Sequence, residues 1–178
     1  MNGILLLEQS LNGLQFGLML FLLAAGLTLV FGIMDMINLA HGSLYMVGAF
    51  FAWMLLNYAG VNYWIALVVA PIGVGLIGVL IEKTMLRWLH GLDHLYGLLL
   101  TFGLALILEG IFREFYGSSG LPYELPQVFR GVFDLEFMML PKYRAWVVLV
   151  SVVICLFTWY VIEKTKLGAY LQIGRAHV

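Results

Sequence analysis

The sequence predicts an all-α fold, a polytopic bundle of about five transmembrane helices with a discontinuous helix near residues 33–43. Of the 178 residues, 63% are hydrophobic and only 11% are charged, whereas a soluble domain is about half apolar and about a quarter charged. Five continuous apolar runs reach or approach the roughly 20 residues that a helix needs to cross a bilayer. Because these runs are continuous rather than alternating, they exclude a transmembrane β-barrel.

The five apolar runs, taken in chain order, give the expected helices. They cover residues 11–32, 43–58, 63–81, 96–112 and 144–162. The first run carries no charge, the second is shorter than a full span, and the fourth has Glu109 near its end. Because lipid offers no hydrogen-bond partner to an open backbone, each run is expected to be helical.

Most of the charge lies in the connections between these runs. Residues 82–94 join the third and fourth helices, and residues 113–143 form one long extracytoplasmic loop with three of the four prolines. Proline disfavours regular helix in this loop, although its segment "VFRGVFDLEF" is able to pair as a short hairpin.

The orientation of the bundle follows from where the basic residues lie. The two sides carry equal numbers, with Lys83, Arg87, Lys164 and Lys166 on one side and Arg113, Arg130, Lys142 and Arg144 on the other. The first group lies in compact segments beside helix ends, where the positive-inside rule applies best. We therefore expect residues 82–94 and the C-terminal segment in the cytoplasm, and the N-terminus and the long loop outside.

A polar stretch, "GIMDMINLAHG", separates the first two apolar runs. Asp35, Asn38 and His41 are spaced by three, so on a helix they would lie close to one face, while Gly32 and Gly42 weaken the helix. A broken membrane helix is tolerated only where its backbone is buried in protein or lines a wet cavity, as in many transporters. The equal alternative is an ordinary cytoplasmic turn in which Ser43 caps the second helix.

Other chemistries find little support in the sequence. A single histidine without a second His or Cys nearby is a poor metal-ligand set, and His41 and Ser43 are too close in sequence for serine-type catalysis. Glu109 with His41 is the one acid–base pair open to an intramembrane enzyme, but Glu109 has a simpler partner in Arg113 at i+4. The net charge of −1 gives no basic surface for nucleic acid.

The segment "GLTLVFGIMDMINLAHGSLYMVGAF" resembles the N-terminal signature of the permease subunit of branched-chain amino acid ABC importers. That signature is a glycine-led apolar helix, then "G-x-x-x-x-I/V-N-x-A-H-G", then "Y-M-x-G-A". It is met here by Gly32, Ile37, Asn38, Ala40, His41, Gly42, Tyr45, Met46, Gly48 and Ala49. The segments "LLLTFGLALILEG" and "EKTKLGAYL" are similar to later parts of the same family, so the resemblance covers residues 11–171. Urea-importer permeases share much of the motif.

The resemblance implies a multi-pass permease subunit in the bacterial inner membrane that imports branched-chain amino acids. The alternative substrate is urea or a related small amide or amino acid. The implied partners are ABC ATPase subunits, a second related permease subunit, a periplasmic substrate-binding protein and the lipid bilayer. The chain has no G-x-x-x-x-G-K-[ST] loop, so we expect it to bind no cofactor and its partner to use ATP.

The resemblance also implies which residues act. Roles in the substrate pathway or its gating are expected for Asp35, Asn38, His41, Gly42 and Ser43. Residues of the cytoplasmic segment are expected to contact the ATPase, together with residues 82–94, and the candidates are Lys164, Lys166, Leu167 and Gly168.

Two further expectations concern alternatives and the end of the chain. An ion- or proton-coupled carrier stays open, because Asp35, His41 and Glu109 are ionisable residues of the kind that move protons in membranes. After Leu171 the family pattern calls for Arg-Ala, whereas this chain reads "QIGRAHV", which resembles the translation of a sequencing-adapter read-through. We therefore expect residues 172–178 to be a non-native tail, and residues 1–171 to be the N-terminal part of an ABC-importer transmembrane domain.

Overall fold

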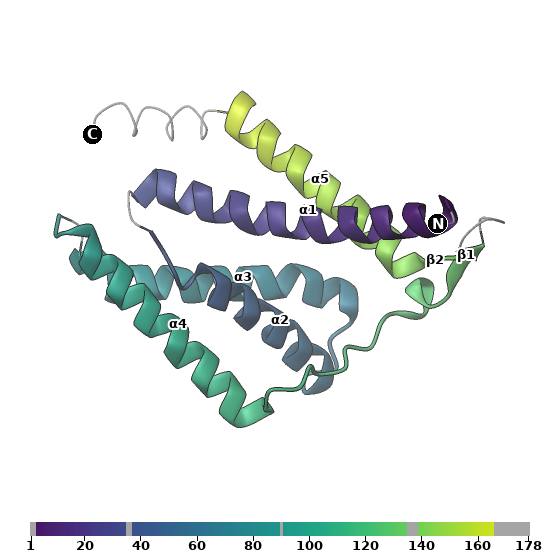
Figure 1. Cartoon of the computed structure of the whole chain (residues 1–178). Coiled ribbons are helices and arrows are strands. Elements are labelled where there is room, and N and C mark those ends of the chain that lie inside the picture. The colour runs from purple at the N-terminus through teal and green to yellow at the C-terminus, as the bar shows by residue number, and fades with distance from the viewer. Residues whose placement is uncertain (1–2, 35–36, 90, 135–138, 166–178) are drawn as a thin grey trace. The chain divides into compact units, whose positions relative to one another are not determined.

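The computed structural model describes residues 3–34, 37–89, 91–134 and 139–165. In these residues the chain forms five α-helices, two short 3-10 helices and one two-stranded antiparallel sheet (Figure 1). The chain divides into two compact units: unit 1 is Met1–Ile33 with Leu125–Val178, and unit 2 is Met34–Glu124. The predicted all-α class with five helices is confirmed.

Unit 1 contains the first and last helices and the hairpin of the long loop. Its elements are α1 (Gly3–Met34), η2 (Gln127–Phe129), β1 (Val132–Asp134), β2 (Met139–Pro141) and α5 (Lys142–Lys164). The predicted hairpin forms, with Val132 opposite Pro141 and Phe133 opposite Leu140. Its second strand begins at Met139, beyond the segment that the sequence suggested. Phe129 is buried against Trp146 at the start of α5, with ring centroids 5.0 Å apart.

The first helix starts earlier than the apolar run predicts. It begins at Gly3 rather than near residue 11. The leucines before Glu8 are good helix formers, and the Ser10 hydroxyl donates to the Leu6 carbonyl at 2.7 Å within the helix. Glu8 and Ser10 are exposed and do not interrupt the helix, so hydropathy alone predicts its start too late.

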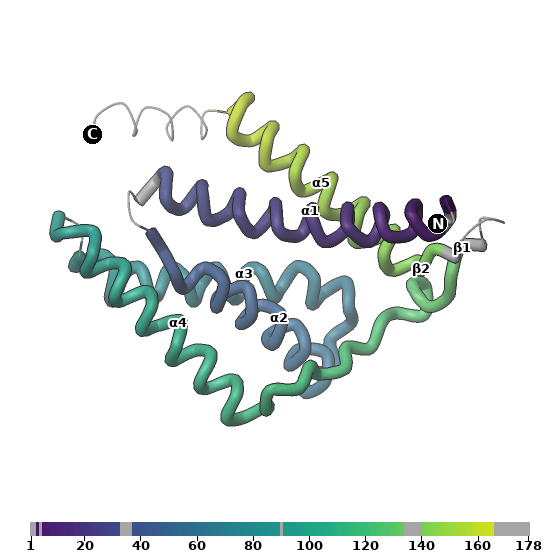
Figure 2. Tube along the Cα trace, viewed as in Figure 1, coloured from purple at the N-terminus to yellow at the C-terminus, as the bar shows by residue number. Residues whose placement is uncertain are grey.

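Unit 2 contains α2 (His41–Asn57), α3 (Tyr63–Thr84), η1 (Leu86–Leu89) and α4 (His94–Tyr116). Helices α2 and α3 pack along each other (Figure 2), and small residues make the close approach possible. Ala66 and Ala70 of α3 are buried. A Cβ atom built on Gly73 would lie 2.2 Å from Cε1 of Phe51, so this position of α3 admits only glycine without movement of the ring.

Helix α4 starts and ends at residues with a clear physical role. The Asp93 carboxylate accepts the N–H of Leu95 at 3.0 Å and caps the helix, while Gly117 follows its end with φ of 75°. The helix is therefore longer at both ends than the predicted 96–112. Near its C-terminus Phe112 stacks on Phe50 of α2, with centroids 4.5 Å apart.

Four of the described helical segments are long and apolar enough to cross a membrane: Leu5–Gly32, Tyr63–Leu89, His94–Tyr116 and Lys142–Lys164. At most 11% of the apolar window in each is buried inside the structure, so these helices present apolar surface outward, as lipid-facing helices do. Helix α2 has 17 residues, and the prediction that this segment is short is confirmed. The chain is a multi-pass membrane protein.

Candidate functional site

The described residues of the polar stretch between α1 and α2 lie outside any helix, which fits both the predicted break and the alternative turn. Helix α1 ends at Met34 and α2 begins at His41, and the described residues 37–40 are not helical. Asp35 lies outside the described residues. The depth of the break in the membrane stays a prediction.

Asn38 shapes the chain within the break. Its side-chain oxygen accepts the N–H of Ala40 at 2.9 Å, and its backbone carbonyl accepts the N–H of His41 at 3.3 Å. A side-chain oxygen that bonds the backbone two residues on makes an Asx turn, which substitutes for a backbone turn. The amide of Asn38 therefore stabilises the chain direction just before α2.

Thr101 of α4 forms a hydrogen bond that connects the break to the rest of unit 2. Its hydroxyl oxygen accepts the N–H of Leu39 at 3.1 Å, and its side chain is fully buried. The Thr101 hydroxyl donates to the Gly97 carbonyl, with 2.9 Å between the two oxygens. The sequence did not single out Thr101, although it is the one hydroxyl residue in the apolar run between Tyr96 and Glu109, and that isolation was the signal that could have found it.

The turn alternative, in which Ser43 caps α2, is wrong in its choice of cap. The cap position is Ala40, which makes no side-chain cap bond, and Ser43 lies inside the first turn of the helix. The Ser43 hydroxyl instead donates to the Ala105 carbonyl of α4 at 3.5 Å. The Asn38 side chain accepts the N–H of Ala40, and the cap of α2 lies three residues before the predicted cap Ser43.

His41 and Gly42 begin α2 beside these contacts. His41 is half-buried and Gly42 is exposed. A Cβ built on Gly42 would meet no described atom within 4 Å, so packing among the described residues does not require glycine there. The structure thus brings Asn38, His41, Gly42 and Ser43 to the start of α2, next to α4.

Glu109 is engaged by its own helix. Its carboxylate pairs with the Arg113 guanidinium at 3.2 Å, and both side chains are more than half exposed. The predicted i,i+4 pair is confirmed, and exposed pairs of this kind contribute about 0.3–0.5 kcal/mol. The acid–base pair with His41 is therefore not supported, since the Glu109 carboxylate already has a partner.

The candidates for ATPase contact lie at the end of α5. Lys164 is the last residue of that helix and is exposed. Lys166, Leu167 and Gly168 lie outside the described residues, as do residues 172–178. The predicted contact stays a prediction.

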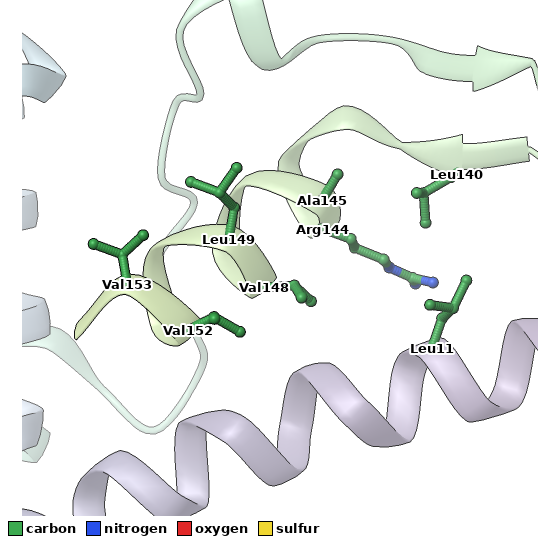
Figure 3. Close-up of a pocket in the computed structure, with 8 residues that line it drawn as sticks. All are labelled: Leu11, Leu140, Arg144, Ala145, Val148, Leu149, Val152 and Val153. Atoms are coloured by element: carbon green, nitrogen blue, oxygen red, sulfur yellow. The ribbon is translucent and has the colours of Figure 1, made fainter. Parts of the chain in front are cut away.

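Unit 1 has an apolar groove of about 420 Å³ between α1 and α5 (Figure 3). Its lining is Leu11, Leu140, Arg144, Ala145, Val148, Leu149, Val152 and Val153. The guanidinium of Arg144 is its charged group and donates to the side-chain oxygen of Asn12. None of the predicted site residues lines this groove. The break between α1 and α2, which contacts α4, is therefore the better candidate site.

Comparisons with known proteins identify the family to which the chain is similar. Residues 9–175 match the family described as "Branched-chain amino acid transport system / permease component". The permease protein LivH of Salmonella typhimurium is 32% identical over 133 residues, which are 70% of this chain and 42% of the relative. LivH of Escherichia coli K12 is 31% identical over the same coverage. BraD of Pseudomonas aeruginosa is 34% identical over 111 residues, 58% of this chain and 36% of the relative.

These curated relatives are named high-affinity branched-chain amino acid transport system permease proteins. The chain spans less than half of their length, and no solved structure gave a significant match. Since the family match runs through the helix break and nearly the whole sequence, the chain belongs to the family of branched-chain amino acid transport system permease components.

Proposed function

We propose that this chain forms part of the permease subunit of an ABC importer that carries branched-chain amino acids across the bacterial inner membrane. The observation that carries the proposal is the family match over residues 9–175, which includes the break between α1 and α2. The relatives bear the names of branched-chain amino acid permeases. The chain acts as a transport subunit rather than as an enzyme.

The energy for transport comes from a separate ATPase subunit. The sequence has no phosphate-binding G-x-x-x-x-G-K-[ST] loop, so ATP is used by the partner and this chain binds no cofactor. The partners are ABC ATPase subunits, a second related permease subunit and a periplasmic substrate-binding protein. Lys164 with the following residues Lys166, Leu167 and Gly168, and the segment 82–94, form the surface for the ATPase.

The break serves as part of the substrate pathway or its gate, with Asp35, Asn38, His41, Gly42 and Ser43 as the acting residues. Among the described residues, no backbone carbonyl outside the helix accepts a hydrogen bond from the N–H groups of Gly42 and Ser43. Free N–H groups at the start of a helix, with the positive end of its dipole, favour a carboxylate. An amino acid substrate carries such a group, and glycine at position 42 lets it approach the backbone.

The proposal is tested by uptake into proteoliposomes. The complete permease that contains this sequence is reconstituted with its ATPase, its second permease and its binding protein, and uptake of labelled leucine is followed with and without ATP. We expect ATP-dependent uptake that unlabelled isoleucine and valine inhibit and that urea does not.

Two results would contradict the proposal. Uptake that follows a proton or sodium gradient without ATP would show a coupled carrier instead. Inhibition by urea, without inhibition by any branched-chain amino acid, would keep the importer and change its substrate.

A further inference from the structure

The hydroxyl of Thr101 joins two segments that lie more than 60 residues apart in the sequence. It accepts the N–H of Leu39 at 3.1 Å, across a separation of 62 residues. A threonine hydroxyl has one proton to donate and two lone pairs to accept with. For that proton the Gly97 carbonyl lies 2.9 Å away on its own helix, while the Ile37 carbonyl lies 3.5 Å away in the break.

Two other threonines in the described helices bond only within their own helix. Thr28 donates to the Ala24 carbonyl at 2.9 Å and Thr84 donates to the Leu80 carbonyl at 2.7 Å, each within its own helix. Thr101 makes the same backbone bond within α4 and adds the contact to Leu39. It is also fully buried, so water does not compete for its hydroxyl.

Among the described residues, few other hydrogen bonds hold the break in place. The Asx turn of Asn38 is local and fixes only the next two residues. The Ser43 hydroxyl reaches the Ala105 carbonyl at 3.5 Å, the limit of a hydrogen bond. The Thr101 contact is therefore the shortest described hydrogen bond between the break region and α4.

We propose that Thr101 is a positioning residue, whose hydroxyl holds residues 37–40 on α4 and so keeps Asn38 and His41 in place at the start of α2. The role of the start of α2 in transport rests on the proposed function, whereas the hydrogen bond between Thr101 and Leu39 does not. This hydrogen bond is uncharged, and its donor is the backbone N–H of Leu39. A substitution of Thr101 therefore removes it without changing any side chain of the break.

The test compares variants that differ by one hydroxyl group. Thr101→Val keeps the branched shape and removes the hydroxyl, whereas Thr101→Ser keeps the hydroxyl and removes the methyl group. Thr28→Val is the matched control, because it removes a threonine hydroxyl that bonds only within its own helix. All variants are made in the complete transporter with Cys155 replaced by Ser.

The readout is the accessibility of the break itself. Leu39→Cys keeps the backbone N–H, and the Leu39 side chain is 41% exposed, so a maleimide can report on the segment. We expect Thr101→Val to change the labelling rate of this cysteine by about fivefold, as loss of a hydrogen bond of ordinary strength predicts. Leucine uptake should fall about tenfold, and Thr101→Ser should restore both values to within about twofold. Thr28→Val should change neither.

Three outcomes would overturn the proposal. One is unchanged labelling and uptake in Thr101→Val, and another is equal loss in Thr101→Val and Thr101→Ser, which would assign the effect to packing. If Thr101→Val does not insert, Thr101→Ala is compared with Thr101→Ser, since these two differ only by the hydroxyl oxygen. Failure of both hydroxyl-free variants to assemble, while Thr101→Ser assembles, would make Thr101 a folding residue.

The two proposals fail separately. If the parent transporter takes up no branched-chain amino acid but its labelling follows the expected pattern, the proposed function is refuted and the positioning role is supported. If the parent transporter shows normal ATP-dependent uptake but the labelling rate is the same with and without the Thr101 hydroxyl, only the positioning role is refuted.

Discussion

Gly73 is a residue whose identity the packing of unit 2 explains. A Cβ at this position would lie 2.2 Å from Cε1 of Phe51 on α2, far inside van der Waals contact. Gly75, two residues along the same helix, meets no described atom within 4 Å. Of these two glycines, only Gly73 makes the close contact with α2.

We expect Gly73→Leu to lower the thermal stability of the permease, because the added side chain must displace the Phe51 ring. Overpacking of this kind costs about 1–3 kcal/mol. The measurement is the melting midpoint of the complete chain in detergent, followed by size-exclusion chromatography after heating. Gly75→Leu is the control and should leave the midpoint unchanged or raise it. Equal midpoints for the two variants would show that α2 and α3 do not pack as described.

Asn38 is the second residue with a specific prediction. Asn38→Ala removes the oxygen that accepts the Ala40 N–H at 2.9 Å, so we expect uptake to fall about tenfold while membrane insertion stays normal, as loss of one hydrogen bond in the part-buried turn implies. Serine also forms side-chain turns, more weakly than asparagine, so Asn38→Ser should recover part of the uptake. Normal uptake in Asn38→Ala, or no difference between the two variants, would contradict the role of the turn.

The elements show where sequence reasoning succeeds in this chain and where it stops. Five apolar runs predicted five helices, because a long apolar run in lipid has few other ways to satisfy its backbone. The observed helices extend beyond the predicted bounds, to Gly3 in α1 and to Tyr116 in α4, because capping and not hydropathy decides where a helix stops. The break was predicted from its polar residues and glycines, whereas its partner on α4 was not. The sequence marks Thr101 only as an isolated hydroxyl residue in an apolar run, and its contact with Leu39 depends on tertiary packing.

The start of α2 makes a prediction about the pathway. Gly42 is exposed and open on the side where a Cβ would point, so Gly42→Leu should leave insertion and melting behaviour of the permease unchanged. If substrate or a moving segment approaches the N–H groups of this turn, the leucine side chain blocks it, and we expect uptake to fall more than in Asn38→Ala. Insertion is measured by membrane fractionation and uptake with labelled leucine. Normal uptake in Gly42→Leu would place the pathway elsewhere.

The molecule as a whole presents apolar surface over most of its helical length. Few of the described residues are buried, and besides Ala40, Ala66 and Ala70 they include Leu86 and Phe129. Many large aliphatic and aromatic side chains are exposed. Lipid covers such a surface in a membrane protein.

The orientation of the molecule gives the last prediction. We expect Ser118→Cys, in the long loop, to react with a membrane-impermeant maleimide in cells whose outer membrane has been permeabilised and whose inner membrane is intact. Thr84→Cys, at the end of α3 beside Lys83, should react only after the membrane is opened. The reason is the compact placement of Lys83, Arg87 and Lys164 beside helix ends, which retains a segment in the cytoplasm. Cys155 is replaced by Ser in both variants, and the chain without introduced cysteine gives the background. The reverse pattern would place Lys164 outside the cell, where it could not meet an ATPase, and would refute the proposed contact together with the orientation.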